Sequence, residues 1–331
     1  MSRSDDLPVF VSGEAVDEVL DLGEAITAVR DAYSTPLESG AAPPRAVARS
    51  HGARLRALAA IMPTGDLMGV KLLAQPRSGG LTYLIVLFDQ SDGRLLALLD
   101  GDRITAVRTA ATSAVAVDAL APQSPLRLGM LGSGHEARAH LRALAAIRPI
   151  ETVSVFSPTP ERRRAFAAWA STQLELRVTP VDDPRAAVNG ATTVVCAARA
   201  VGEVPIIDGN ALGDDTLVVS IGSTLPDQRE LDVATLARAS LIVADLPDEV
   251  LGSSGDGIAA AAAGENLAPK TRSLHQLVRG MIGDGDHAGI TVFKSVGSAI
   301  QDIAVARLAL SGARSRGLTA AVPVTLKPQE R

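Results

Sequence analysis

The chain has 331 residues, of which 47% are hydrophobic and 21% are charged, a balance typical of folded globular proteins. Its net charge of −5 and its aromatic content of only 2% exclude the basic or base-stacking surfaces that nucleic acids require, so we expect no nucleic-acid partner. At this length we expect two domains.

The start of the chain carries Asp5 and Asp6 where a secretory signal would have an apolar run. No later segment approaches the ~18 uninterrupted apolar residues of a membrane span. We therefore expect a cytoplasmic protein with no membrane partner. The single cysteine, Cys196, has apolar neighbours and is expected in the core, and the histidines lack metal-ligand spacing, so no metal is predicted.

The first part of the chain predicts a strand, one helix and an antiparallel sheet. A short strand over residues 7–11 precedes a helical pattern over residues 12–38, with stop signals at Pro36 and Gly40. Strand-like runs then follow at close spacing, which favours antiparallel pairing. These runs are residues 46–51, 54–61, 69–73, 82–89 and 95–99.

From Gly101 onward the pattern changes to a long helix, residues 102–120, and then to alternating strands and helices as far as about residue 300. This alternation predicts parallel strands joined by crossover helices. A final helix over residues 299–309 is expected to return to the first domain. The predicted parallel strands are residues 126–131, 152–156, 193–197, 217–221 and 241–244.

A glycine-rich loop, residues 132–137 (GSGHEA), follows the first of these strands and precedes an alanine-rich helix. This is the G-x-G-x-x-A pattern of a dinucleotide site in its required strand, turn and helix context. Gly132 permits the tight turn, and Gly134 lets the backbone approach the pyrophosphate at the helix N-terminus. A glycine-rich turn without a ligand is the alternative. The expected cofactor contacts here are Gly132, Gly134, His135 and Glu136.

The second parallel strand ends in Ser157 and not in the acidic residue that would hold both ribose hydroxyls of NAD. Ser157 cannot repel a 2′-phosphate, and Thr159 or Arg162 can bind one. We therefore expect NADP(H) to be favoured, with NAD(H) possible. The alternative is that the arginines at residues 162–164 form a solvated helix face.

Three further segments, together with the glycine loop and residues 222–232, resemble the ornithine cyclodeaminase/μ-crystallin family. They are residues 62–64 (MPT) with 69–71 (GVK), residues 105–111 (TAVRTAA) and residues 291–297 (TVFKSVG). The resemblance implies an α/β fold, with a Rossmann doubly wound parallel sheet over residues 121–299. This domain is inserted into an α+β substrate-binding and dimerisation domain, residues 1–120 and 300–331, of a homodimer.

The resemblance also implies hydride chemistry at the α-carbon of an amino acid or its imine, with the substrate carboxylate held by Arg45, Lys71 and Arg108. Lys71 lies between two apolar residues of a predicted strand, and Arg108 lies on an apolar stripe of a predicted helix, so both point inward. A buried cation needs either an anionic ligand or an internal carboxylate, so a structural ion pair is the alternative. A desolvated Lys71 can also exchange a proton with the substrate nitrogen.

The sequence departs from cyclising members of the family at two positions. Thr224 stands where those members have an aspartate assigned to acid/base work, and Ala60 stands where they have a glutamate. Asp227 is then the best remaining carboxylate and Glu230 the second, with helix capping the alternative for Asp227. These departures favour similarity to the imine reductases of the family.

The remaining expectations come from matching single positions to the family. Ser295 and the backbone at Val296 are expected to contact cofactor and substrate, and Lys294 is expected to face a structural carboxylate. Thr82 matches a cofactor-contacting position, although threonine is also simply common in strands. Gly222 is expected beside the cofactor.

These observations together predict an NAD(P)H-dependent reductase of a small α-imino acid, such as Δ1-pyrroline-2-carboxylate, which also runs in reverse as an amino-acid dehydrogenase. The first alternative is a cyclodeaminase that releases ammonia from ornithine or lysine. The second is a dinucleotide-dependent binding protein with weak catalysis, as in the crystallin relatives.

Overall fold

A computed structural model describes residues 7–198, 204–283, 289–324 and 326. The chain forms two compact units. The first unit comprises Met1–Thr109 and Ser298–Arg331, and the second unit comprises Ala110–Gly297. The boundary falls within helix α3 (Asp102–Leu120), which has the bounds predicted for it.

The first unit begins with strand β1 (Val9–Val11) and two helices, α1 (Gly13–Val19) and α2 (Leu22–Ser34). The prediction of one helix over residues 12–38 is therefore wrong. Asp21 interrupts it, because its side chain accepts a hydrogen bond of 2.9 Å from the N–H of Glu24 and so caps a new helix. The apolar spacing continues across Asp21, but the N-cap hydrogen bond of this aspartate ends one helix and starts another.

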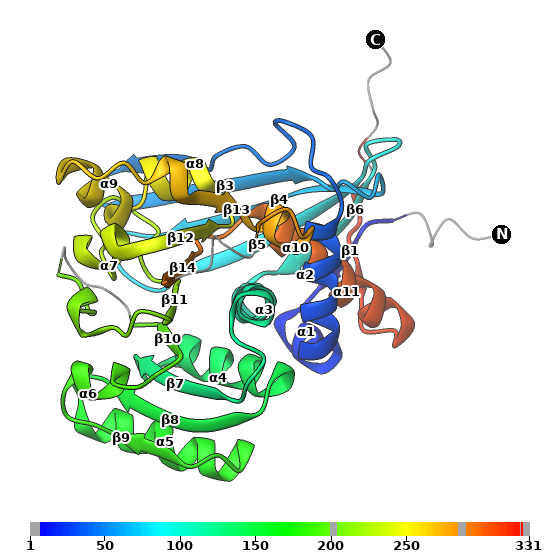
Figure 1. The fold of residues 1–331 in the computed structure, drawn as a ribbon. Helices are drawn as coiled ribbons and strands as arrows, with labels where there is room; N and C mark the ends of the chain where they lie inside the picture. The colour runs from blue at the N-terminus through cyan, green and yellow to red at the C-terminus, as the bar shows by residue number, and fades with distance from the viewer. Residues whose placement is uncertain (1–6, 199–203, 284–288, 325, 327–331) are drawn as a thin grey trace. The chain divides into compact units, whose positions relative to one another are not determined.

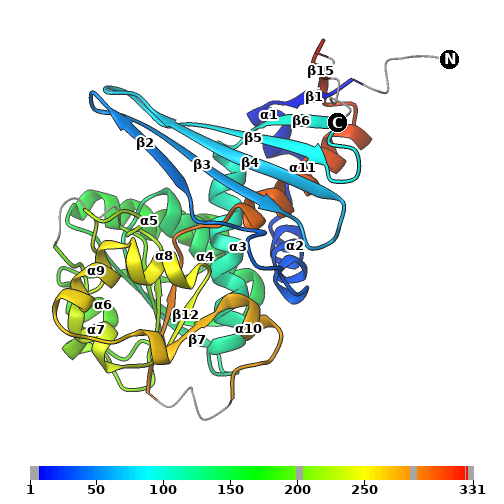
Figure 2. The same ribbon diagram turned by 90° about the horizontal axis from the view of Figure 1, so that it is seen from above.

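A seven-stranded sheet forms the centre of the first unit, in the order β15-β1-β6-β5-β4-β3-β2. Strands β2 to β6 pair antiparallel with their sequence neighbours, which confirms the predicted antiparallel sheet, and β1 runs parallel to β6. Helix α11 (Ala299–Ser315) packs along one face of this sheet and against α2, as Figure 2 shows. The strands are β2 (Ala46–Ser50), β3 (Ala53–Ile61), β4 (Leu67–Gln75), β5 (Thr82–Asp89), β6 (Leu95–Asp100) and β15 (Ala320–Ala321).

Helix α11 packs on only one of the two faces of this sheet. On β4 the side chains of Lys71 and Leu73 are buried on the face that α11 covers, which we call the inner face. Gly69 lies on the same face, and a Cβ there would come 3.3 Å from Ile303 of α11. Alternate residues point to the opposite, outer face, where Met68, Val70, Leu84 and Val86 of β4 and β5 are apolar and only partly buried.

The second unit contains an eight-stranded, entirely parallel sheet in the order β13-β12-β14-β11-β10-β7-β8-β9. Its first strand, β7, has the predicted bounds, Leu126–Leu131. The strands β9, β13 and β14 were not predicted. The other strands are β8 (Ile150–Phe156), β9 (Val178–Pro180), β10 (Thr193–Cys196), β11 (Leu217–Ser220), β12 (Ala239–Ala244), β13 (Thr271–Ser273) and β14 (Ile290–Lys294).

The chain moves outward from β7 to β8 and β9 and then returns to β10 on the other side of β7. Since crossovers are right-handed, α4 and α5 lie on one face of the sheet and α6 on the other. The carboxyl ends of β7 and β10 therefore flank the point where strand order reverses, where doubly wound sheets bind ligands. The helices, visible in Figure 1, are α4 (His135–Ile147), α5 (Pro160–Leu174), α6 (Pro184–Val188), α7 (Val233–Arg238), α8 (Pro247–Gly252), α9 (Gly255–Ala262) and α10 (Leu274–Val278).

Cys196, at the end of β10, is fully buried in the core of the second unit, as expected. Within the described ranges, no helix has both the length and the apolar character that crossing a membrane requires.

Candidate active site

The glycine loop joins β7 to α4 in the second unit and borders a pocket of about 380 Å³. Gly132 has a φ of +123°, and a Cβ there would lie 2.5 Å from the carbonyl oxygen of Ala197. Glycine is therefore required at this position by the protein itself. Gly134 has an ordinary φ, and a Cβ there would meet nothing within 4 Å, so the space beside it belongs to the pocket.

Gly134 is also the N-cap residue of α4, and it provides no side-chain cap for the helix. The first N–H groups of a helix lack intrahelical acceptors, and the helix dipole makes this end attractive to anions. An uncapped N-terminus, open space at Gly134 and a tight glycine turn together fit the pyrophosphate of a dinucleotide. His135 is exposed and Glu136 half-buried in the first turn of this helix.

The carboxyl end of β8 forms the other side of this pocket. Ser157 accepts a hydrogen bond of 2.9 Å from the Ser133 hydroxyl, which ties this end of β8 to the glycine loop. Arg163 is buried, donates to the Ser157 carbonyl and forms an ion pair with Asp182, so it serves the fold. Arg162 is exposed and lines the pocket together with Thr159. Among the described lining residues, Arg162 is the only charged one.

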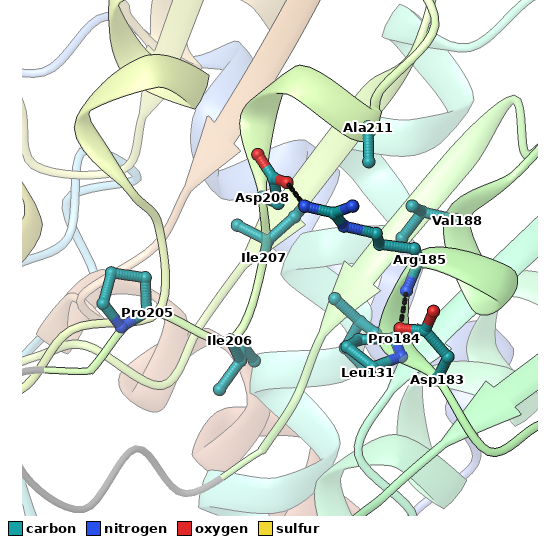
Figure 3. A pocket seen from close by; sticks show the side chains of 10 residues that line it. All are labelled: Leu131, Asp183, Pro184, Arg185, Val188, Pro205, Ile206, Ile207, Asp208 and Ala211. Atoms are coloured by element: carbon teal, nitrogen blue, oxygen red, sulfur yellow. Dashed lines mark hydrogen bonds and ion pairs between the residues drawn. The ribbon is translucent and has the colours of Figure 1, made fainter.

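A smaller pocket of about 200 Å³ adjoins the first one, because Leu131 and Ile206 line both (Figure 3). Its arginine, Arg185, forms an ion pair of 2.7 Å with Asp208, and Asp183 caps α6. The charged groups of this pocket are therefore satisfied within the protein, which distinguishes it from the pocket at the glycine loop.

A buried charge cluster lies on the inner face of the first unit. Lys71 Nζ lies 2.7 Å from Asp302 Oδ1, and Arg108 Nε lies 2.9 Å from the same oxygen. Arg108 also donates to Gln301 Oε1 at 2.7 Å, and the Gln301 amide donates to the hydroxyl of Tyr33 at 2.9 Å. Both cations point inward as predicted, and the internal carboxylate that pairs with both of them is Asp302.

Burial and the nearby positive charge of Arg108 lower the pKa of Lys71 to about 7, although Asp302 opposes this shift. The charge of Arg45 lowers the pKa of Lys71 further. The structure thus brings two of the three predicted carboxylate-binding residues, Lys71 and Arg108, together around a single acid. The role predicted for Arg45 stays a prediction.

Asp302 and Gln301 were not identified from the sequence. Both are fully buried in α11, within the otherwise apolar run of residues 299–306. Two polar residues in a buried helix signal a polar partner. The two polar residues are visible in the sequence, but the sequence does not show which cations Asp302 would contact.

The segment of residues 222–232 places its acidic side chains in three different environments. Asp227 lies exposed in a turn, and helix capping is excluded as its role because Asp232 caps α7. Thr224 is half-buried, and its N–H donates to Gln228 Oε1 at 3.2 Å. Glu230 is fully buried and holds the loop at Gly222, whose N–H donates to Glu230 Oε2.

Around Glu230 the second unit has its own buried charge cluster. Lys294 Nζ lies 2.9 Å from Asp256, which confirms the prediction that Lys294 faces a structural carboxylate. Lys294 also donates to the Ser220 hydroxyl, which in turn donates to Glu230 at 2.7 Å. Burial raises the pKa of Glu230 to about 7.

The loop after β14 is held by Asp245, another residue that the sequence did not reveal. Its carboxylate accepts from the Ser295 hydroxyl at 2.6 Å and from the N–H groups of Val296 and Gly297 at 3.0 and 2.8 Å. The loop is therefore rigidly positioned, and the expected ligand contacts of Ser295 and Val296 stay predictions. Thr82 lies exposed at the start of β5.

A parallel doubly wound sheet with a glycine loop at its switch point defines a dinucleotide-binding fold. The model of the ornithine cyclodeaminase/mu-crystallin family matches residues 8–316 of this chain. The iminosuccinate reductase of Paracoccus denitrificans is 31% identical over 240 residues, which make up 72% of this chain and 73% of that protein. A Δ1-pyrroline-2-carboxylate reductase of Bacillus cereus is 31% identical over 265 residues, or 76% of this chain and 79% of that protein.

A similar solved structure is that of Thermococcus litoralis Δ1-pyrroline-2-carboxylate reductase in complex with NADH and L-proline. It matches with a TM-score of 0.87 and 28% identity, covering 95% of this chain and 100% of that one. The chain therefore belongs to the ornithine cyclodeaminase/mu-crystallin family. The family and the fold class predicted from the motifs are confirmed.

Proposed function

We propose that this protein is a nicotinamide-dinucleotide-dependent reductase of a small α-imino acid. The observation that carries the proposal is the pair of buried cations Lys71 and Arg108, which share a single carboxylate oxygen of Asp302. Two cations that share one acid suit a substrate carboxylate. The two enzymes named above as relatives are, by their names, reductases of iminosuccinate and Δ1-pyrroline-2-carboxylate, both of which join a C=N bond to a carboxylate.

In this mechanism the residues of the first unit bind the substrate carboxylate, orient the C=N bond and protonate the imine nitrogen. Arg45 and Arg108 hold the carboxylate, so that the adjacent C=N bond has one orientation, and positioning of this kind carries much of a rate. A reduced dinucleotide, when bound, would supply the hydride for the imine carbon. Lys71, whose pKa is about 7, donates a proton from Nζ to the imine nitrogen, and solvent then restores it. Asp302 keeps Lys71 in place throughout.

Cyclodeamination is the less favoured function. Ala60 is buried on β3 and Thr224 is half-buried, and neither has a carboxyl group to exchange a proton with an amine. Asp227 remains a second candidate for the proton donor. Its side chain is exposed in a turn, so it is less firmly positioned than the buried side chain of Lys71.

For the cofactor we propose a preference for NADP(H). The lining of the glycine-loop pocket supports it, since Arg162 lies beside Ser157 and Thr159 and no described lining residue is acidic. An acid at the end of the second strand selects the free ribose hydroxyls of NAD, whereas an arginine accommodates a 2′-phosphate. A Ser157→Asp variant should weaken NADPH binding and leave NADH binding nearly unchanged.

We also propose a homodimer that forms through the outer face of the first unit. That face carries partly buried apolar side chains in register across β3, β4 and β5. An apolar hollow on it is lined by Ala59, Met68, Val70 and Phe88, among others. A contiguous apolar patch on a protein surface marks an interaction site, and a second copy of the same face would cover it.

The test of the proposed function is to mix the protein with NADPH or NADH and a panel of linear and cyclic α-imino acids. Absorbance of the reduced cofactor is followed together with ammonia release from ornithine and lysine. Cofactor oxidation with an imino acid supports the reductase. Ammonia release without net oxidation indicates a cyclodeaminase, and dinucleotide binding with neither reaction indicates a binding protein.

A further inference from the structure

The inner face of the first unit carries more arginines than the three carboxylate-binding cations explain. The register pairs Leu58 with Lys71 and Arg56 with Leu73. Since alternate residues of a strand share a face, Arg56 lies on the same face as Lys71, two residues further along β3. It is a diagonal neighbour of Lys71 across the two strands, and such neighbours lie within reach of long side chains.

The surroundings of Arg56 are positive, and one of its own donor atoms is left without an acceptor. Its side chain is half-buried, and the Nε atom is buried with no hydrogen-bond partner among the described residues. Burial and the charges of Arg45, Arg54 and Arg49 lower the pKa of Arg56 to about 10, so it stays charged at neutral pH. A buried charged donor without an acceptor is costly, which indicates an anion that arrives with a ligand.

Asp302 pairs with Lys71 and Arg108, and among the described residues no ion pair joins it to Arg56. The charge of Arg45 lowers the pKa of both Lys71 and Arg56. The inner face therefore continues from the carboxylate-binding cluster to a second cation, Arg56. A ligand with one carboxylate would satisfy only the first.

We propose that Arg56 binds a second carboxylate of the substrate, so that the preferred substrate is a dicarboxylic α-imino acid. This inference rests on the proposed reductase function and specifies its substrate class. The α-carboxylate would meet Arg45, Lys71 and Arg108, and the side-chain carboxylate would meet the guanidinium of Arg56. An arginine is suited to this because its planar donors match a carboxylate.

The experiment compares two imino acids formed in situ with ammonia, one from oxaloacetate and one from pyruvate, which differ by the second carboxylate. For the wild-type protein we expect a higher kcat/KM with the dicarboxylic imine. Arg56→Gln should lower that kcat/KM by about 10- to 100-fold, the range for one charge-assisted hydrogen bond, and leave the monocarboxylic reaction nearly unchanged. Arg56→Lys should restore part of the loss.

The matched control is Arg94→Gln, which changes an arginine that is 46% exposed in the side chain and lies in a turn of the same unit. Calorimetric titration with L-aspartate and L-alanine in the presence of NADP⁺ gives a second readout, in which Arg56→Gln should remove the preference for aspartate. Equal losses for both imines, no aspartate preference, or a raised KM for NADPH alone would each overturn the inference. If the wild type reduces no imino acid at all, the proposed function itself fails.

Discussion

Lys71 and Asp302 are 231 positions apart in the chain, and their side chains meet at 2.7 Å in the buried interior of the first unit. Arg108 reaches the same carboxylate oxygen. One acid thus holds two cations whose charges would otherwise repel each other. This sharing of one acid by two cations is the basis of the proposed binding of a substrate carboxylate.

Asp302→Asn should leave Lys71 and Arg108 buried without a counter-charge. We expect the free energy of unfolding to fall by about 3–5 kcal/mol, as for other buried pairs that lose one partner. Urea unfolding measures it. Asp92→Asn, at a side chain that is 56% exposed, is the control and should change stability by less than about 0.5 kcal/mol. Equal effects of the two substitutions would show that Asp302 is not a structural counter-ion.

Lys71→Met should reduce imine turnover by about 10²- to 10⁴-fold, the contribution typical of a positioned proton donor. Because the pKa of Lys71 is lowered to about 7, the proton is present below that pH and lost above it. In the wild type, kcat/KM for reduction should therefore decline as the pH rises above about 7. Lys71→Arg keeps the charge but not the exchangeable proton, so it should affect kcat more than KM. Full turnover by Lys71→Met would exclude the proton-donor role.

The two glycines of the loop should respond differently to alanine. Gly132→Ala places a Cβ against the Ala197 carbonyl at a strained φ, so it should destabilise the protein. Gly134→Ala meets no protein atom and should leave stability nearly unchanged while weakening dinucleotide binding. Thermal unfolding and calorimetric titration with NADPH separate the two effects. Undiminished NADPH binding by Gly134→Ala would mean that the pyrophosphate lies elsewhere.

Val70→Asp should convert the proposed homodimer into a monomer, because it places a charge on the apolar outer face. Size-exclusion chromatography with light scattering measures the mass. Ser124→Asp, at an exposed position of the second unit, is the control and should leave the mass unchanged. A wild-type protein that is monomeric at all concentrations would contradict the proposal.

His140 should make stability depend on pH. It is buried between the Ser113 hydroxyl and the Glu136 carbonyl, and burial lowers its pKa to about 4. Between about pH 4 and pH 6.5 the imidazole of His140 is therefore protonated in the unfolded chain and neutral in the folded chain. Stability from this group is therefore present above about pH 6.5 and lost as the pH falls toward 4, by up to about 3 kcal/mol.

Glu230 changes the pH dependence of stability in the opposite direction. Its raised pKa means that the folded state, and not the unfolded state, binds the extra proton between about pH 4.5 and 7. The stability that this group contributes is therefore lost as the pH rises toward 7. The informative quantity is thus the difference in unfolding free energy between the wild type and His140→Gln, measured at several pH values. The exposed His51→Gln is the matched control. A difference that does not change with pH would show that His140 is not held neutral.

Local patterns were sufficient for most of the elements. The bounds of β5, β7 and α3 agree with those predicted, because each has a strong turn or proline signal beside it. The helix over residues 12–38 was wrong because the N-cap at Asp21 is a competing local signal within the same apolar period. The strand β14, which was not predicted, lies inside the parallel sheet between β12 and β11.

By itself, the sequence determined the family, the dinucleotide loop and the inward direction of Lys71 and Arg108. These features depend on the spacing of residues along the chain, and that spacing is visible within a single strand, turn or helix. Only the tertiary structure decided that Asp302 pairs with both cations, that Asp245 holds the loop at Ser295 and that Arg56 lies beside Lys71. Partners of this kind come from distant segments or neighbouring strands, and no local period encodes which of them will meet when the core closes.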